Sequence, residues 1–156
     1  MIKVLFICLG NICRSPMAEA VFQNLVNEAG LAGQFEIDSA GMADWHSGER
    51  ADRRTLAVLK KHDIPYAGRS RQVQPADLRR FDYVLAMDSQ NVADLRRLDR
   101  GDALDGKLHR LLDFAPAGHP QDVPDPYYDG RFDYVYELVD AASRGLLAHI
   151  RQEHRL

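Results

Sequence analysis

A strand, a glycine-containing loop and a helix follow one another within the first thirty residues of the chain. Lys3 to Ile7 is rich in β-branched and aromatic residues, which is typical of a strand buried on both faces of a sheet. Ser15-Pro16 then offers a helix N-cap with proline at the first helical position, and apolar residues recur at helical spacing before Gly30. This order predicts the opening unit of a parallel α/β fold, with the loop from Cys8 to Ser15 at the carboxyl end of its strand.

The rest of the chain continues this alternation. We expect two more strands, two more helices, a helix capped by Asp88, and a long ordered loop that contains four prolines. In residue numbers, the strands are 35–39 and 83–87, the helices are 50–62 and about 132–150, and the loop is 116–130. Such alternation implies right-handed crossovers, and it predicts a three-layer α/β/α fold with about four parallel strands.

The size and composition of the chain restrict its class. A length of 156 residues predicts a single domain over residues 1–156, and 20 basic against 23 acidic residues argue against a nucleic-acid binder. No apolar run approaches the length of a membrane span, so we expect no membrane insertion. Two cysteines are too few for a disulfide framework, which predicts a reducing, cytoplasmic location. The six histidines lack ligand spacing, so neither a metal nor another cofactor is expected.

The loop after the first strand places Cys8 and Arg14 six positions apart. A turn that enters a helix leaves main-chain N–H groups unpaired, and these groups can converge on an anion together with the positive end of the helix dipole. Arg14 adds a planar fork that can grip two phosphate oxygens. The loop therefore predicts a phosphate-binding site.

Three smaller residues suit the same loop. Gly10 and Asn11 tolerate the backbone angles of a tight curl, and the hydroxyl of Ser15 can stabilise a thiolate by a hydrogen bond. Positive surroundings favour the thiolate form of Cys8, which is the form that attacks phosphorus. The alternative, a buried structural thiol, leaves the glycine, the arginine and the serine unexplained. Cys8 is thus the predicted nucleophile.

Aryl phosphates also need a proton donor, because a phenolate leaves poorly without one. Asp125 is the candidate: it precedes Pro126 and two tyrosines, Tyr127 and Tyr128, in the long loop before the last helix. Taken alone, this segment is also a turn signature, so the residues leave both interpretations open.

With these residues in place, the sequence resembles the low-molecular-weight protein tyrosine phosphatase family over nearly its whole length. The resemblance is carried by five segments: 8–16 (CLGNICRSP), 38–39, 44–45, 86–88 and 125–128 (DPYY). It implies a small parallel sheet flanked by helices, no metal, and hydrolysis of phosphotyrosine and small aryl phosphates through a cysteinyl-phosphate. It also implies tyrosine-phosphorylated proteins as substrates and a cognate tyrosine kinase as a further partner.

The resemblance assigns roles to individual residues. Cys8 is the nucleophile, Arg14 binds the phosphoryl group, and Asp125 acts first as acid and then as base. The residues expected to form or support the loop are Leu9, Gly10, Asn11, Ile12, Cys13, Ser15 and Ser39. The residues expected to form the substrate pocket are Ile12, Trp45, Tyr127 and Tyr128.

One position departs from the family pattern. Members often carry a histidine that supports the loop asparagine, and the aligned position here is Gly68, which predicts a different network around Asn11. Two regulatory hypotheses also arise. Cys13 is either an apolar filler or a partner for Cys8 in a protective disulfide, and phosphorylation of Tyr127 or Tyr128 is a conceivable control.

Other functions fit parts of the pattern. A phosphoarginine phosphatase of the same fold is the nearest rival, although in that branch the position of Ile12 resembles a threonine, and isoleucine suits an aromatic ring better. A thiol-dependent arsenate reductase would need redox cysteines beyond Cys13. A phosphate-binding module without turnover and a redox-sensing interaction protein built on Cys8 and Cys13 are further alternatives.

Overall fold

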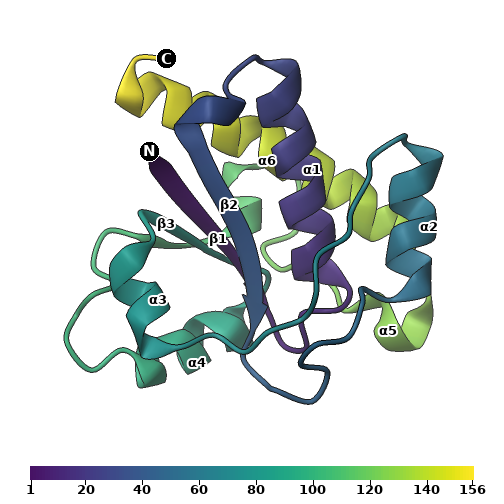
Figure 1. Cartoon of the computed structure of the whole chain (residues 1–156), viewed down its shortest axis with the longest axis horizontal. Helices are drawn as coiled ribbons and strands as arrows, with labels where there is room; N and C mark the ends of the chain where they lie inside the picture. Colours follow the sequence, from purple (N-terminus) through teal and green to yellow (C-terminus); the bar gives the residue numbers. More distant parts are fainter.

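The computed structural model describes residues 1–156 and places β1 (Ile2–Cys8) at the centre of a four-stranded sheet. The strand order is β2-β1-β3-β4, with β2 at Phe35–Gly41, β3 at Tyr83–Ala86 and β4 at Leu108–Arg110. All three pairings are parallel, as the alternating sequence predicts (Figure 1). The carboxyl ends of the strands therefore meet at one edge of the sheet.

Both faces of the sheet are buried, which explains the apolar run that fills β1 after Lys3. Val4 and Phe6 point into the larger core cluster, whereas Leu5 and Ile7 point into the smaller one on the opposite face. All four side chains are fully buried. Burial of each such side chain contributes roughly 1.5–3 kcal/mol to stability, so this strand anchors the loop that follows it.

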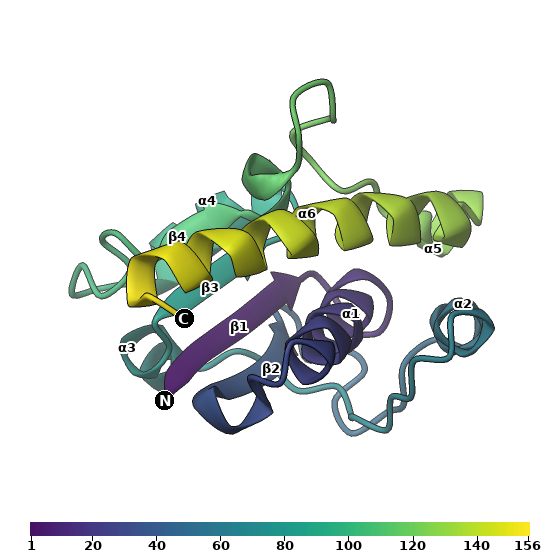
Figure 2. The same cartoon turned by 90° about the horizontal axis from the view of Figure 1, so that it is seen from above.

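Helices cover the two faces of the sheet. The larger cluster joins the sheet to α1 (Arg14–Glu28) and α6 (Phe132–His154), and the smaller one joins it to α3 (Pro75–Arg80) and α4 (Ser89–Leu98) (Figure 2). The remaining elements are α2 (Arg53–Lys61), α5 (Pro126–Asp129) and two short 3-10 helices, η1 (Ala32–Gln34) and η2 (Leu111–Phe114). The fold is thus the expected three-layer α/β/α arrangement.

Several element ends differ from the sequence predictions. The predicted N-cap at Ser15 is wrong: α1 begins at Arg14 with Cys13 in the cap position, because the Ser15 hydroxyl turns back to the Cys8 sulfur instead. Asp88 caps α4 as predicted, accepting a bond from the Asn91 N–H group. The expected loop 116–130 contains α5, and the elements α3 and β4 were not predicted.

Gly145 in α6 allows η2 to approach closely. A Cβ atom at this position would lie 1.9 Å from the main-chain oxygen of Phe114. Because η2 leads into the segment that carries Asp125, this approach helps to place one wall of the pocket described below.

Gly145→Ala is expected to lower the free energy of unfolding by about 1–3 kcal/mol. Alanine improves helix propensity by about 1 kcal/mol, but the clash with Phe114 forces a backbone shift that costs more. Urea unfolding checks this, with Ser143→Ala as the control. The Ser143 hydroxyl is buried without a partner, so its loss should leave stability within about 1 kcal/mol or raise it. A more stable Gly145→Ala protein would contradict the expectation.

The longest helix, α6, interrupts its apolar positions with charged residues such as Asp140 and Arg144. No helix of the chain meets the requirements of a membrane span.

Candidate active site

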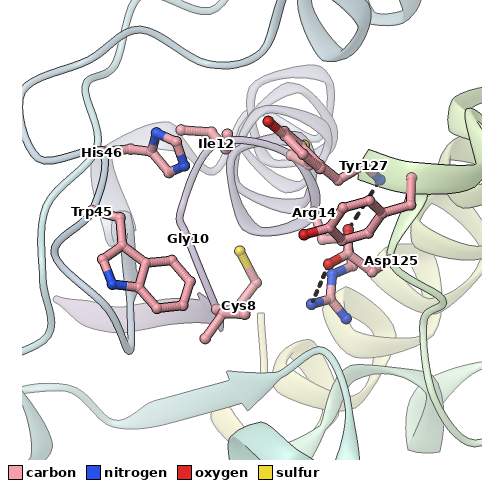
Figure 3. Close-up of a pocket in the computed structure, with 11 residues that line it drawn as sticks. Cys8, Gly10, Ile12, Arg14, Trp45, His46, Asp125 and Tyr127 are labelled. Carbon is pink, nitrogen blue, oxygen red and sulfur yellow. Dashed lines mark hydrogen bonds and ion pairs between the residues drawn. The ribbon is translucent and has the colours of Figure 1, made fainter.

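A pocket opens at the carboxyl end of β1, where the loop between β1 and α1 meets two other segments (Figure 3). Its lining residues are Cys8, Leu9, Gly10, Ile12, Cys13, Arg14, Trp45, His46, Asp125, Tyr127 and Tyr128. The loop supplies the floor, the segment after β2 supplies Trp45 and His46, and the segment around α5 supplies the rest. The structure therefore brings Cys8, Arg14 and Asp125 together from distant parts of the sequence.

The loop presents unpaired main-chain donors. Asn11 has a left-handed conformation, with φ of 55°, and its N–H group donates to the Cys8 sulfur at 3.2 Å. Six other N–H groups of the loop and the start of α1 donate to no acceptor within the chain: those of Leu9, Gly10, Ile12, Cys13, Arg14 and Ser15. Such groups, together with the positive end of α1, form a cradle suited to an oxyanion.

Cys8 sits at the base of this cradle. Its residue is 3% exposed, and the Ser15 hydroxyl lies 3.0 Å from its sulfur. The Asn11 side-chain amide donates to the oxygen of that hydroxyl at 2.7 Å. Because the Ser15 oxygen already accepts from Asn11, its own hydrogen is free to point at the sulfur. The surroundings thus offer two donors to a thiolate.

Arg14 is buried but held by acceptors. Its Nη1 atom donates to Asp88 Oδ2 at 2.6 Å and to the main-chain oxygen of Val123 at 3.0 Å. Burial opposes its charge, yet Cys8, Asp88 and Asp125 outweigh that effect and raise the pKa of Arg14. Since Nη1 is engaged from behind, the guanidinium is fixed in orientation with its charge beside the cradle.

Asp125 lies at the mouth of the pocket, at the N-cap of α5. Its Oδ1 atom accepts from the Tyr127 N–H group at 3.1 Å, and its Oδ2 atom lies 3.8 Å from Arg14 Nη2. The side chain is 39% exposed, so it is accessible to a bound molecule and to water. Pro126 at the first helical position suits this short helix, because proline lacks the N–H that would be unpaired there.

Aromatic side chains form two opposite walls above Cys8. Trp45 lies on one side, and Tyr127 lies with Asp125 on the other (Figure 3). Trp45 is 68% exposed and Tyr128 is 89% exposed, which is unusual for rings of this size. The guanidinium of Arg54 lies 5.5 Å from the centre of the Tyr127 ring and braces that wall. A flat ring can fit between the walls.

The other predicted residues take different places. Asn11, Ser15 and Ser39 are buried behind the loop and do not line the pocket, whereas Ile12 does. Burial is the main cause that raises the pKa of the Cys13 thiol to about 12, so this thiol stays neutral near pH 7.

Sequence reasoning missed two contributors. His46 lines the pocket, with its Nδ1 atom 2.9 Å from Glu49 Oε2, and no local pattern marks it. Asp88 was expected only as a helix cap, yet its second oxygen holds Arg14. Its position two residues after the end of β3, which pairs with β1 in the sheet, is the signal that could have indicated this contact.

The fold and the site together define an α/β protein whose first loop, built around a cysteine, has the form of an oxyanion cradle. Residues 3–156 match the family described as low molecular weight phosphotyrosine protein phosphatase. The chain belongs to this family, and it is therefore a hydrolase.

Individual relatives cover the chain almost completely. The low molecular weight protein-tyrosine-phosphatase YfkJ of Bacillus subtilis is 45% identical over 100% of both chains. Its crystal structure superimposes with a TM-score of 0.94 over 98% of this chain and 96% of that one. A low molecular weight protein-tyrosine-phosphatase of Streptomyces coelicolor is 50% identical over 97% of this chain and 94% of its own length. A Drosophila arginine phosphatase is 30% identical, with a TM-score of 0.88 and coverage of 96% and 98%.

Proposed function

We propose that this protein hydrolyses phosphotyrosine in proteins, and small aryl phosphates, through a phosphate ester formed on Cys8. The observation that carries the proposal is the loop itself, in which six N–H groups without an acceptor and the fixed Arg14 guanidinium lie in the segment that follows one buried sulfur. These donors match the three free oxygens of a phosphoryl group bound to that sulfur. The partners are then tyrosine-phosphorylated proteins and the kinase that phosphorylates them.

In the first step, the Cys8 thiolate attacks phosphorus, and the bond between phosphorus and the phenolic oxygen breaks. Asp125 gives its proton to that oxygen, so tyrosine leaves as a neutral phenol. The loop N–H groups and Arg14 stay hydrogen-bonded to the phosphoryl oxygens as negative charge develops on these oxygens. Because Asp125 is the more exposed of the two and Cys8 is buried, a phosphoryl group between them would meet the nucleophile on its inner side and the acid on its outer side.

In the second step, the Asp125 carboxylate takes a proton from water as the water oxygen attacks phosphorus. The bond between phosphorus and sulfur breaks, and inorganic phosphate and the Cys8 thiolate are released. The hydroxyl of Ser15 and the N–H group of Asn11 stabilise the departing sulfur. The cycle returns both residues to their starting state without a metal.

The pocket walls support an aromatic substrate. Trp45 and Tyr127 offer ring faces, and the apolar side chain of Ile12 lines the space between the loop and the rim. A phosphoarginine would place a charged guanidinium beside Ile12, whose apolar side chain offers it no acceptor. The similarity to an arginine phosphatase therefore makes phosphoarginine the substrate to compare.

We expect phosphotyrosine peptide to be hydrolysed with a kcat/KM at least about 100-fold above that of the matching phosphoarginine peptide. Desolvation of the guanidinium against the apolar Ile12 side chain costs a few kcal/mol, which sets this ratio. Release of phosphate measured with both peptides, in buffer with a metal chelator, checks it. The same peptides with unmodified side chains serve as blanks. Equal rates, or activity that disappears with the chelator, would overturn the proposal.

A further inference from the structure

A continuous series of buried and half-buried hydrogen bonds lies behind the loop between β1 and α1 and ends at the Cys8 sulfur. Six side chains form it, and it is called the support chain below: Tyr66, Glu19, Ser39, Asn11, Ser15 and Cys8. It begins in the segment before α3, passes through α1 and β2, and ends at the reacting sulfur. The inner three links support the loop directly, whereas Tyr66 and Glu19 touch neither the loop nor the pocket.

The direction of each hydrogen bond is fixed by one main-chain donor. The N–H group of Arg71 donates to Asn11 Oδ1 at 3.0 Å, so the Asn11 nitrogen must face the two serines. That nitrogen donates to Ser15 at 2.7 Å and to Ser39 at 3.0 Å. Ser39 then has its own hydrogen free, and it donates to Glu19 Oε1 at 2.6 Å.

Glu19 is the shared acceptor at the outer end of the support chain. Its Oε1 atom accepts from Ser39 and, at 2.9 Å, from the hydroxyl of Tyr66. Burial raises the pKa of Glu19, and the two donors oppose that shift. Burial and the Glu19 charge also raise the pKa of Tyr66, so its phenol stays protonated and can only donate here. Loss of the phenol would leave a half-buried carboxylate with one donor fewer.

The space for the Tyr66 hydroxyl depends on a neighbouring glycine. A Cβ atom at Gly68 would lie 2.3 Å from Tyr66 Oη and 2.6 Å from Cζ, so any larger residue displaces the ring. Because Gly68 has no side chain, the Tyr66 phenol has the space it needs to reach Glu19.

We infer that Tyr66, with the space left by Gly68, is a positioning residue for the reaction of Cys8. Its hydroxyl fixes the position of the Glu19 carboxylate. The hydrogen bonds of the support chain then fix Ser39, Asn11 and the Ser15 hydroxyl that faces the sulfur. Tyr66 thus preserves the thiolate and the left-handed turn of the loop without contacting substrate. This role rests on the proposed function, because it presupposes that the thiolate is the reacting group.

The test compares Tyr66→Phe with the parent protein. Alkylation of Cys8 by iodoacetate at pH 5.5 should slow roughly three- to tenfold, which corresponds to part of one hydrogen bond to a charged group. Alkylation at pH 9, above the ordinary pKa of a cysteine thiol, should stay within twofold of the parent rate. The kcat for phosphotyrosine peptide should fall by a similar factor, and KM should change less, because the cradle amides remain.

Two further variants make the outcome specific. Gly68→Ala should reproduce the effects of Tyr66→Phe by displacing the ring, and the double variant should lose no more than either single variant. Tyr83→Phe is the matched control: Tyr83 also donates to a glutamate, Glu153, but at the opposite end of the sheet, so both rates should stay at parent values.

Parent-like alkylation and turnover in both Tyr66→Phe and Gly68→Ala would overturn the inference. Equal losses in Tyr83→Phe would do the same, since they would reflect general destabilisation. The alkylation assay needs no turnover. If the parent protein hydrolyses no phosphotyrosine, the proposed function fails, whereas the alkylation rates still report on Tyr66.

Discussion

Cys8→Ser is expected to abolish phosphotyrosine hydrolysis, with kcat at least about 10,000-fold below the parent value. A serine hydroxyl at this position stays protonated near pH 7 and attacks phosphorus poorly, even with every oxyanion donor in place. Phosphate release from a phosphotyrosine peptide measures the loss. Rapid acid quenching with radiolabelled substrate should trap phosphate on the parent protein and none on the variant.

The control for this change is the other cysteine. The Cys13 thiol is buried and neutral near pH 7, so Cys13→Ser should still form the trapped phosphoenzyme and lose less than about tenfold in rate. Urea unfolding and binding of inorganic phosphate show whether Cys8→Ser retains its fold and its cradle. Turnover by a folded Cys8→Ser protein at a rate near that of the parent would rule out the covalent route.

Asp125→Asn is expected to lower kcat for phosphotyrosine peptide by roughly 100- to 1,000-fold, the usual contribution of a general acid. The loss should be much smaller for para-nitrophenyl phosphate, because nitrophenolate leaves without a proton. Asparagine keeps an oxygen that can accept from the Tyr127 N–H group, so α5 retains its cap. Steady-state rates with both substrates give the comparison.

Asp129→Asn is the matched control for Asp125→Asn. Asp129 ends the same short helix and accepts from a main-chain N–H group, that of Arg131, but it does not line the pocket. Its substitution should change kcat by less than about twofold. If Asp125→Asn lost the same factor with both substrates, the side chain would act on binding or structure, and another group would supply the proton.

Much of the fold could be predicted because its long elements have clear patterns. The apolar run of β1 after Lys3 and the helical spacing of α6 each indicate one structure over several consecutive residues. In contrast, β4 has only three residues, all half-buried, and its backbone pairing with β3 has no local signal. The N-cap prediction at Ser15 failed because a tertiary contact with Cys8 competes with the local one.

Some residues of the candidate site could also be predicted from the sequence, and others could not. Cys8 and Arg14 lie in one local segment whose chemistry can be inferred from residue types and spacing alone. Asp125 needed the resemblance, since from the residues alone its segment is equally a turn. The roles of Asp88 and Tyr66 depend on which strands and segments meet in space, and a single sequence does not contain that information.

The two halves of the pocket are built by different parts of the molecule. The floor, with Cys8 and Arg14, belongs to the connection between β1 and α1 and is tied to the core, whereas Trp45 stands exposed after β2 and Tyr127 and Tyr128 stand exposed on α5. The proposed nucleophile and phosphate-binding arginine are therefore encoded apart from these rings, and only Asp125 shares a segment with two of them. New partners could be acquired, by natural drift or by directed evolution, through exchange of these three rings while the bond-breaking apparatus stays intact.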